Sequence, residues 1–173
     1  MTLSRIRVPL GFVVGALVLY LAMPTPRFIV AGLPLAALGL LWRASAAGII
    51  RKDHSLASDG PYRFTRNPLY FGSFLLALGF SLMSGSLVCA LLVLIPFGLI
   101  YPRVIFREES HLSKLFGREY ETFKQTIPAF FPRRIGWSMF ESFSFQQYRT
   151  NGEYNAGLGF VAVLAILLLK TLA

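Results

Sequence analysis

The sequence has little of what a water-soluble enzyme usually brings to an active site. Its 173 residues include one cysteine, Cys89, and two histidines, and only 14% of the residues are charged. A single cysteine excludes an internal disulfide and a metal site built from several thiolates. Soluble chains carry about 25% charged residues on average, so the low charge argues against an ordinary soluble globule.

Acidic residues are also scarce, since eight Asp and Glu stand against 17 Lys and Arg, for a net charge of +9. A basic chain can bind nucleic acid. Here, however, the basic residues gather at the ends of apolar segments, as cytoplasmic loops of membrane proteins require. We therefore expect no nucleic-acid partner.

Long hydrophobic runs dominate the sequence, which is 55% hydrophobic with a mean hydropathy of +0.60. Five apolar segments cover approximately residues 8–23, 28–50, 69–83, 86–106 and 156–169. Several are shorter than the ~20 residues of a full span, so they must extend into polar flanks or thin the bilayer. We predict one all-α domain, residues 1–173, a polytopic membrane helical bundle with about five transmembrane helices. The first segment has an alternative interpretation as a signal peptide, but it lacks a good cleavage site.

Lysine and arginine predict the orientation of these spans. With the N-terminus inside, the outer face holds only Arg27 and Lys170, and the other basic residues and all the acidic ones fall inside. The positive-inside rule thus places the N-terminus and two polar pieces, 51–68 and 107–155, in the cytosol. We expect these pieces to form a cytosolic cap that carries any chemistry.

The first polar piece ends in Asn67-Pro68, directly before the third apolar segment. Proline suits the first helical position, and asparagine is a natural N-cap. A helix N-terminus at the membrane edge favours a bound carboxylate, because it presents backbone N–H groups and a partial positive charge. The alternative is a capped transmembrane helix without a ligand.

The second polar piece opens with Glu108, which shares a helix face with Leu112 and Leu115 and so points towards the bundle. A carboxylate there is costly without a cationic partner. Arg66 or Arg103 is one possible partner, and the ammonium group of a bound ligand is the other.

Other reactive arrangements are weak. Glu108 and His111 form an E-x-x-H pair, but His54 offers no second pair, so we expect no metal site. No nucleophile–base pair suggests a hydrolase triad. The aromatic residues Phe123, Phe130 and Phe131 suit either a membrane anchor or the entry groove of an acyl or prenyl chain.

An ordered set of motifs runs over residues 54–132. It comprises Gly60-Pro61-Tyr62, Arg66-Asn67-Pro68-Leu69-Tyr70-Phe71-Gly72, a helical hairpin, Glu108-Glu109-x-x-Leu112, Phe116-Gly117-x-x-Tyr120 and a Pro-aromatic-Pro ending. In order and spacing this set resembles the isoprenylcysteine carboxyl methyltransferase and phospholipid methyltransferase superfamily.

The resemblance implies an integral membrane enzyme that methylates a lipophilic acceptor with S-adenosylmethionine at the cytosolic membrane face and releases S-adenosylhomocysteine. The acceptor would be a prenylcysteine-like carboxylate, an aminophospholipid, or another isoprenoid or thiol. It also implies membrane lipids as surroundings, most simply those of a bacterial inner membrane, and no obligate protein partner. The cofactor-binding residues that it implies are His54, Ser55, Leu56, Ala57, Tyr62, Asn67, Pro68, Leu69, Tyr70 and Glu108.

Two positions depart from the family pattern. Asn67 replaces a histidine, and Val104 stands where the prenylcysteine enzymes place an arginine that grips the substrate carboxylate. Arg103 and Arg107 flank this position, although a shift of one residue turns a side chain by about 100°. The candidate substrate-binding residues are Arg103, Arg107 and Phe130. The candidate bases for an ammonium acceptor are Glu109 and His111.

Two other functions remain open at this point. A membrane sterol or enone reductase would bind NADPH, and the basic candidates for its 2′-phosphate are Arg63, Arg66, Arg118 and Arg133. A non-enzymatic scaffold or transporter subunit is the other alternative. It gives no reason for a glutamate that faces the bundle.

Overall fold

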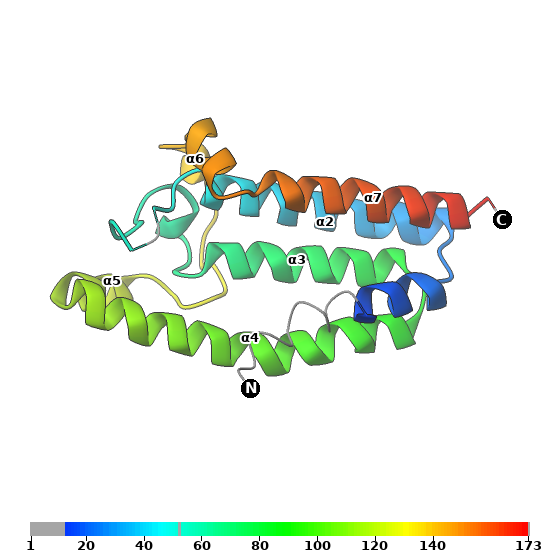
Figure 1. Ribbon diagram of the computed structural model, residues 1–173, viewed down its shortest axis with the longest axis horizontal. Helices are drawn as coiled ribbons and strands as arrows, with labels where there is room; N and C mark the ends of the chain where they lie inside the picture. Colours follow the sequence, from blue (N-terminus) through cyan, green and yellow to red (C-terminus); the bar gives the residue numbers. More distant parts are fainter. Residues whose placement is uncertain (1–12, 52, 173) are drawn as a thin grey trace.

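The computed structural model describes residues 13–51 and 53–172, and in these ranges the chain is helical with no strand. Four helices run along the long axis of the molecule (Figure 1). They are α2 (Pro26–Ala47), α3 (Pro68–Met83), α4 (Leu87–Phe116) and α7 (Tyr154–Lys170). The all-α prediction is therefore confirmed.

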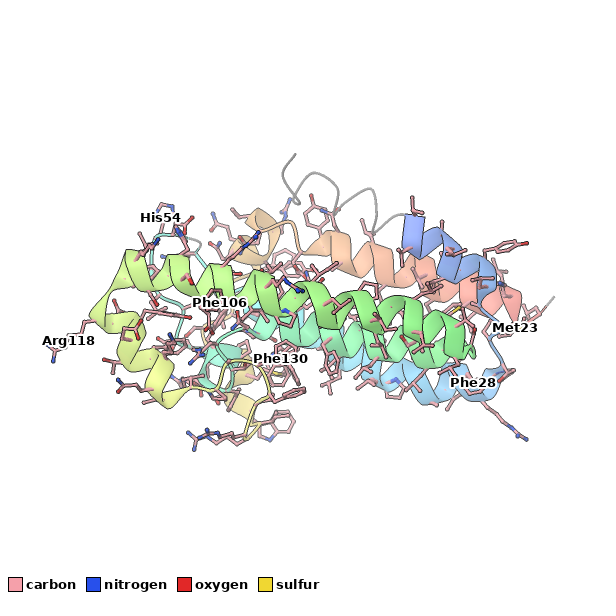
Figure 2. All side chains as sticks on the ribbon, turned by 90° about the horizontal axis from the view of Figure 1, so that it is seen from below. Met23, Phe28, His54, Phe106, Arg118 and Phe130 are labelled. Atoms are coloured by element: carbon pink, nitrogen blue, oxygen red, sulfur yellow. The ribbon has the colours of Figure 1, made fainter. Side chains whose placement is uncertain are left out.

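The short elements gather at one end of the four helices (Figure 1). They are η1 (Gly60–Arg63), α5 (Arg118–Thr126), η2 (Trp137–Phe140) and α6 (Phe145–Thr150). Figure 2 shows His54 and Arg118 at this end, and Met23 and Phe28 at the other. We call this end, residues 48–67 and 117–153, the polar cap. Both polar pieces of the sequence thus meet at one end, as predicted.

Two helices, α2 with 22 residues and α4 with 30, are long and apolar enough to cross a membrane. The apolar helices α3 and α7 have 16 and 17 residues. At 1.5 Å per residue each is about 24–26 Å long, short of the ~30 Å hydrocarbon core of a bilayer. Within residues 13–51 and 53–172, two helices thus meet this length, where five transmembrane helices were expected. Residues 8–12 of the first predicted segment lie outside the described residues.

Helices α2 and α3 pack closely because glycines face glycines. A Cβ atom on Gly39 would lie 2.6 Å from the Gly72 carbonyl oxygen, and one on Gly32 would lie 2.4 Å from the Gly79 carbonyl oxygen. Small residues at such contacts let membrane helices approach backbone to backbone. The pair forms the rigid side of the bundle.

Helix α4 is attached more loosely, and Cys89 is its one buried residue. Its N-terminus is fixed, because the Ser86 side chain caps it and the Cys89 thiol donates to the Val18 carbonyl at 3.4 Å. Pro96 and Pro102 interrupt its backbone hydrogen bonds, which bends a helix. At the polar cap α4 extends past the start of α3 (Figure 1). It also continues past residue 106, where the apolar segment ends, to Phe116.

Helix α6 closes the end of α2. The Asn151 amide donates to the carbonyls of Ala47 and Ile50 at 2.7 and 3.0 Å, and Gln147 donates to Ile50 at 2.9 Å. Carbonyls at a helix C-terminus lack partners within the helix, so these side chains replace them. The segment before α7, for which the sequence suggested no role, therefore anchors the polar cap to α2.

Candidate functional site

A cavity of about 1480 Å³ is lined by α3 and α4, and α7 and the polar cap complete its wall. At the polar cap its lining includes Ser55, Leu56, Ala57, Tyr62, Arg66, Asn67, Tyr70, Glu108, His111 and Glu153. Further along the bundle the lining is apolar and includes Val18, Leu19, Ala77, Phe80, Leu92, Val93, Phe97 and Val163. Small-molecule pockets usually measure about 300–1,000 Å³, so the volume suits a cofactor together with a second molecule.

The residues that the family resemblance assigns to the cofactor lie together. All of them except His54 line this cavity. His54 is exposed in the turn that precedes Ser55. Segments that are far apart in the sequence thus meet here, because α3 begins and α4 ends at the polar cap.

Glu108 faces the cavity and accepts a hydrogen bond from the Tyr70 hydroxyl at 2.6 Å. Within the described residues it forms no ion pair. Neither expected arginine reaches it, because Arg66 pairs with Glu109 and Arg103 donates to the Leu99 carbonyl. Glu108 therefore brings to the cavity a negative charge that no described protein cation pairs with, which favours a cationic ligand.

The neighbouring Glu109 is neutralised. The Arg66 Nε and Nη2 atoms lie 2.9 and 3.3 Å from its two carboxylate oxygens, and the Asn67 amide donates to it at 3.2 Å. The side chains of Arg66 and Glu109 are only 9% and 14% exposed. Arg66 also donates to the carbonyls of Lys124 and Ile127. Glu109, a candidate base, is thus absent from the cavity lining and ties the start of α3 to α4 and α5.

Asn67 occupies the N-cap position of α3, as predicted, but its side chain makes no capping hydrogen bond. Its amide instead donates to Glu109 and, at 2.9 Å, to the Ala129 carbonyl. The backbone angles of Asn67, φ −121° and ψ 55°, lie outside the extended region that capping residues usually adopt. The capping prediction was therefore right for the position and wrong for the side chain.

Tyr62 brings a buried hydroxyl to the cavity. Its oxygen has no hydrogen-bond partner within the described part of the chain. Burial, with the nearby Glu108, Glu153 and Tyr70, raises the pKa of Tyr62 well above its ordinary value of 10.0. The hydroxyl stays neutral and can donate a hydrogen bond. An unsatisfied buried hydroxyl costs about 1–3 kcal/mol, so a ligand acceptor in the cavity would be stabilising.

Sequence reasoning missed the ion pair between Arg43 and Glu153, which lines the cavity beside Tyr62. The two guanidinium–carboxylate distances are 2.6 and 2.9 Å, and Arg43 also donates to the Ser73 hydroxyl at 2.5 Å. The pair joins α2, α3 and the start of α7. One signal was available, since an arginine inside an apolar segment needs a partner. Its partner is 110 positions away, and no local pattern identifies it.

The remaining candidates are dispersed. Arg103 and Arg107 line a separate depression on another face of α4, whereas Val104 lines the cavity. Phe130 packs against Phe71 and Phe74, with ring centroids 5.8 and 5.7 Å apart. His111 lines the cavity, and its Nε2 atom lies 3.1 Å from the Asp53 carboxylate.

Comparison with known proteins gives a family. The phospholipid methyltransferase family model matches residues 28–119, more than half of the chain. The cobalt-zinc-cadmium resistance protein CzcN of Cupriavidus metallidurans is 38% identical over 102 residues, which cover 59% of this chain and 46% of that protein. The nickel-cobalt-cadmium resistance protein NccN of Alcaligenes xylosoxydans xylosoxydans is 37% identical over 102 residues, which cover 59% and 47%.

A further relative is the protein-S-isoprenylcysteine O-methyltransferase of Schizosaccharomyces pombe. It is 36% identical over 81 residues, which cover 47% of this chain and 34% of that protein. Each match thus spans less than half of the relative, and no solved structure matches the chain. The family match runs from within α2 through α3 and α4 to the start of α5, and residues in this range provide most of the cavity lining. The chain therefore belongs to the phospholipid methyltransferase family.

Proposed function

We propose that the protein is an integral membrane methyltransferase that uses S-adenosylmethionine to methylate a lipophilic acceptor. The observation that carries this proposal is Glu108, a carboxylate in a large cavity with no cationic partner among the described residues. S-adenosylmethionine is a cationic ligand, with an ammonium and a sulfonium group. Family membership supports the same reaction class.

The residues at the polar end of the cavity suit the rest of such a cofactor. Tyr70 orients Glu108, which would hold the ammonium group, and Tyr62 offers an unused hydroxyl. The start of α3 at Pro68 and Leu69 presents the positive end of a helix to a carboxylate. Residues 55–57 line the same end of the cavity and would contact the adenosine part of the cofactor. The cofactor supplies an electrophilic methyl group, and the protein holds donor and acceptor together while excluding water.

The apolar end of the cavity suits the chain of the acceptor. An acyl or isoprenoid chain there would bring the head group of a prenylcysteine-like acid, an aminophospholipid or another isoprenoid or thiol towards Tyr70. A carboxylate or thiolate acceptor needs no base, whereas an ammonium acceptor must first lose a proton. His111 is the better candidate for that base, because Glu109 is held by Arg66.

The competing reductase has less support. Of its four candidate arginines, Arg66 lines the cavity, and Glu109 already neutralises it. Arg63 is paired with Asp59 and Glu141, at 3.1 and 2.7 Å. A 2′-phosphate would therefore find no uncompensated arginine among these four in the cavity.

We also propose that the polar cap lies in the cytosol, at a bacterial inner membrane. The excess of basic residues at this end supports the orientation. At the opposite end, Lys170 donates to the carbonyls of Leu19 and Tyr20 at 2.8 and 2.9 Å. Lys170 thus caps the C-terminal end of the helix over residues 13–21.

Calorimetric titration of the purified full-length protein with S-adenosylhomocysteine and with NADPH tests the proposal. We expect the first ligand to bind. Glu108→Gln should weaken its binding about thirtyfold or more, because removing one partner of a buried charge pair costs about 2–5 kcal/mol. Glu119→Gln removes the same charge from an exposed position outside the cavity and should leave affinity unchanged. Wild-type affinity in Glu108→Gln, or binding of NADPH alone, would overturn the proposal.

A further inference from the structure

The outer face of α4 carries a second depression that the proposed methyl transfer does not use. It measures about 580 Å³, and its lining residues are all exposed: Gly98, Leu99, Pro102, Arg103, Phe106 and Arg107. Val104 and Glu108, each one position further along, line the large cavity instead. The two sites therefore occupy different faces of one helix.

Arg103 and Arg107 lie one turn apart in this depression, and neither forms an ion pair within residues 13–51 and 53–172. Three arginines of the cavity and polar cap, Arg43, Arg63 and Arg66, are by contrast each paired with a carboxylate. Like charges at this spacing repel each other. The depression therefore holds positive charge that an anion would compensate.

The rest of this face is apolar. Leu91, Ile95 and Leu99 follow one another at four-residue spacing and are 48%, 53% and 57% exposed. Gly98 forms a low point beside them, because outside its chain neighbours and the nearby backbone of α4 no described atom lies within 4 Å of the position its Cβ atom would take. A hydrocarbon chain can lie along this stripe and reach the two arginines.

The depth of the arginines matches a lipid head group. Arg103 is 16 residues after Leu87, the first residue of α4, which is about 24 Å along the helix. Arg107, one turn further, is about 30 Å along, at the edge of the ~30 Å hydrocarbon core when α4 begins at the other edge. Arg103 lies one turn inside this edge, and its long side chain can extend the guanidinium group to the lipid phosphates. Near an anionic lipid surface, each basic residue increases the affinity of a protein for the lipid by about fivefold.

We propose that this face of α4 binds an anionic phospholipid, with the phosphate at Arg103 and Arg107 and one acyl chain along Leu91, Ile95 and Leu99. The site is separate from the cavity and does not depend on methyl transfer. It gives a role to two arginines that sequence reasoning placed at the substrate.

The test uses delipidated full-length protein in neutral detergent and native mass spectrometry. The protein is titrated with phosphatidylglycerol, with phosphatidylcholine and with soluble glycerol 3-phosphate. We expect phosphatidylglycerol to bind in preference to the other two. The double variant Arg103→Gln/Arg107→Gln should weaken its binding about 25-fold, as two fivefold contributions. The matched control Arg133→Gln/Arg134→Gln removes the same charge from exposed arginines of the polar cap and should bind as wild type.

A second variant keeps the proposal testable if the double variant does not fold. Gly98→Leu leaves both charges and fills the low point, so phosphatidylglycerol binding should fall while S-adenosylhomocysteine binding is unchanged. Equal binding of phosphatidylcholine, equal binding of glycerol 3-phosphate, or full affinity in the folded double variant would each overturn the proposal. A dimer that excludes phosphatidylglycerol would also overturn it, because a second copy of the chain would then cover this face.

Discussion

Helix α3 presents two different surfaces to its neighbours. Towards α2 it places the buried residues Gly72, Leu75 and Gly79, and the two backbones nearly touch. Another face carries Tyr70, Ser73 and Ala77, which line the large cavity. Here α3 meets α4 through long side chains, as in the hydrogen bond from Tyr70 to Glu108. Both sets recur at three- or four-residue spacing, so each follows one face of the same helix. The difference shows how a short helix can be held rigidly on one side while it lines a site on the other.

The largest effect is expected where the contact is tightest. In Gly39→Ala the new methyl group would lie 2.6 Å from the Gly72 carbonyl oxygen and from the Leu76 nitrogen, and backbone atoms cannot move aside as a flexible side chain does. We expect the free energy of unfolding to fall by about 3 kcal/mol, the upper part of the range for overpacking. Denaturant unfolding in detergent measures the change.

Gly98→Ala is the matched control on α4. Outside its chain neighbours and the nearby backbone of α4, no described atom lies within 4 Å of its new methyl group. Because alanine is the better helix former by about 1 kcal/mol, this variant should be as stable as the wild type or more so. If both alanine variants lost the same stability, the tight contact between α2 and α3 would not explain the loss in Gly39→Ala.

The sequence predicted the arrangement of the helices better than it predicted the contacts in the site. The short break between the apolar segments 69–83 and 86–106 predicted one helical hairpin, and helix periodicity predicted that Glu108 points inward. The sequence did not show which of the adjacent Glu108 and Glu109 would take Arg66. That choice depends on where the loop before α3 places the arginine, which is a tertiary property. The contact between Arg43 and Glu153 could not be predicted either, because it too depends on the tertiary structure.

A smaller effect is expected at the ion pair that fastens the start of α3 to α4. Glu109→Gln leaves the nearly buried Arg66 without its carboxylate, so stability should fall by about 2 kcal/mol. Affinity for S-adenosylhomocysteine should fall much less than in Glu108→Gln, because Glu109 does not line the cavity. Measuring unfolding and calorimetric binding on both variants separates the two roles. If Glu109→Gln lost as much affinity as Glu108→Gln, the assignment of a structural role to Glu109 and a binding role to Glu108 would be wrong.

The smallest effect concerns the length of the cavity. Phe80 lines its apolar part and packs against Phe160, with ring centroids 5.7 Å apart. Ten residues separate Tyr70 from Phe80, which is about 15 Å along α3. If an acceptor chain lies here, as the proposed function requires, Phe80 limits its length. Each further methylene that is buried should tighten binding about fourfold.

The measurement is a comparison of geranyl, farnesyl and geranylgeranyl alcohol as competitors or ligands of the purified protein. Phe80→Leu should shift the tightest binding towards the next longer alcohol, while S-adenosylhomocysteine binds as before. Leu82→Ala, on the same helix but 45% exposed and outside the cavity lining, should leave the order unchanged. An unchanged order in Phe80→Leu, with cofactor affinity intact, would place the acceptor chain elsewhere without affecting the assignment of Glu108. The polar and apolar ends of the cavity can therefore be tested independently of each other.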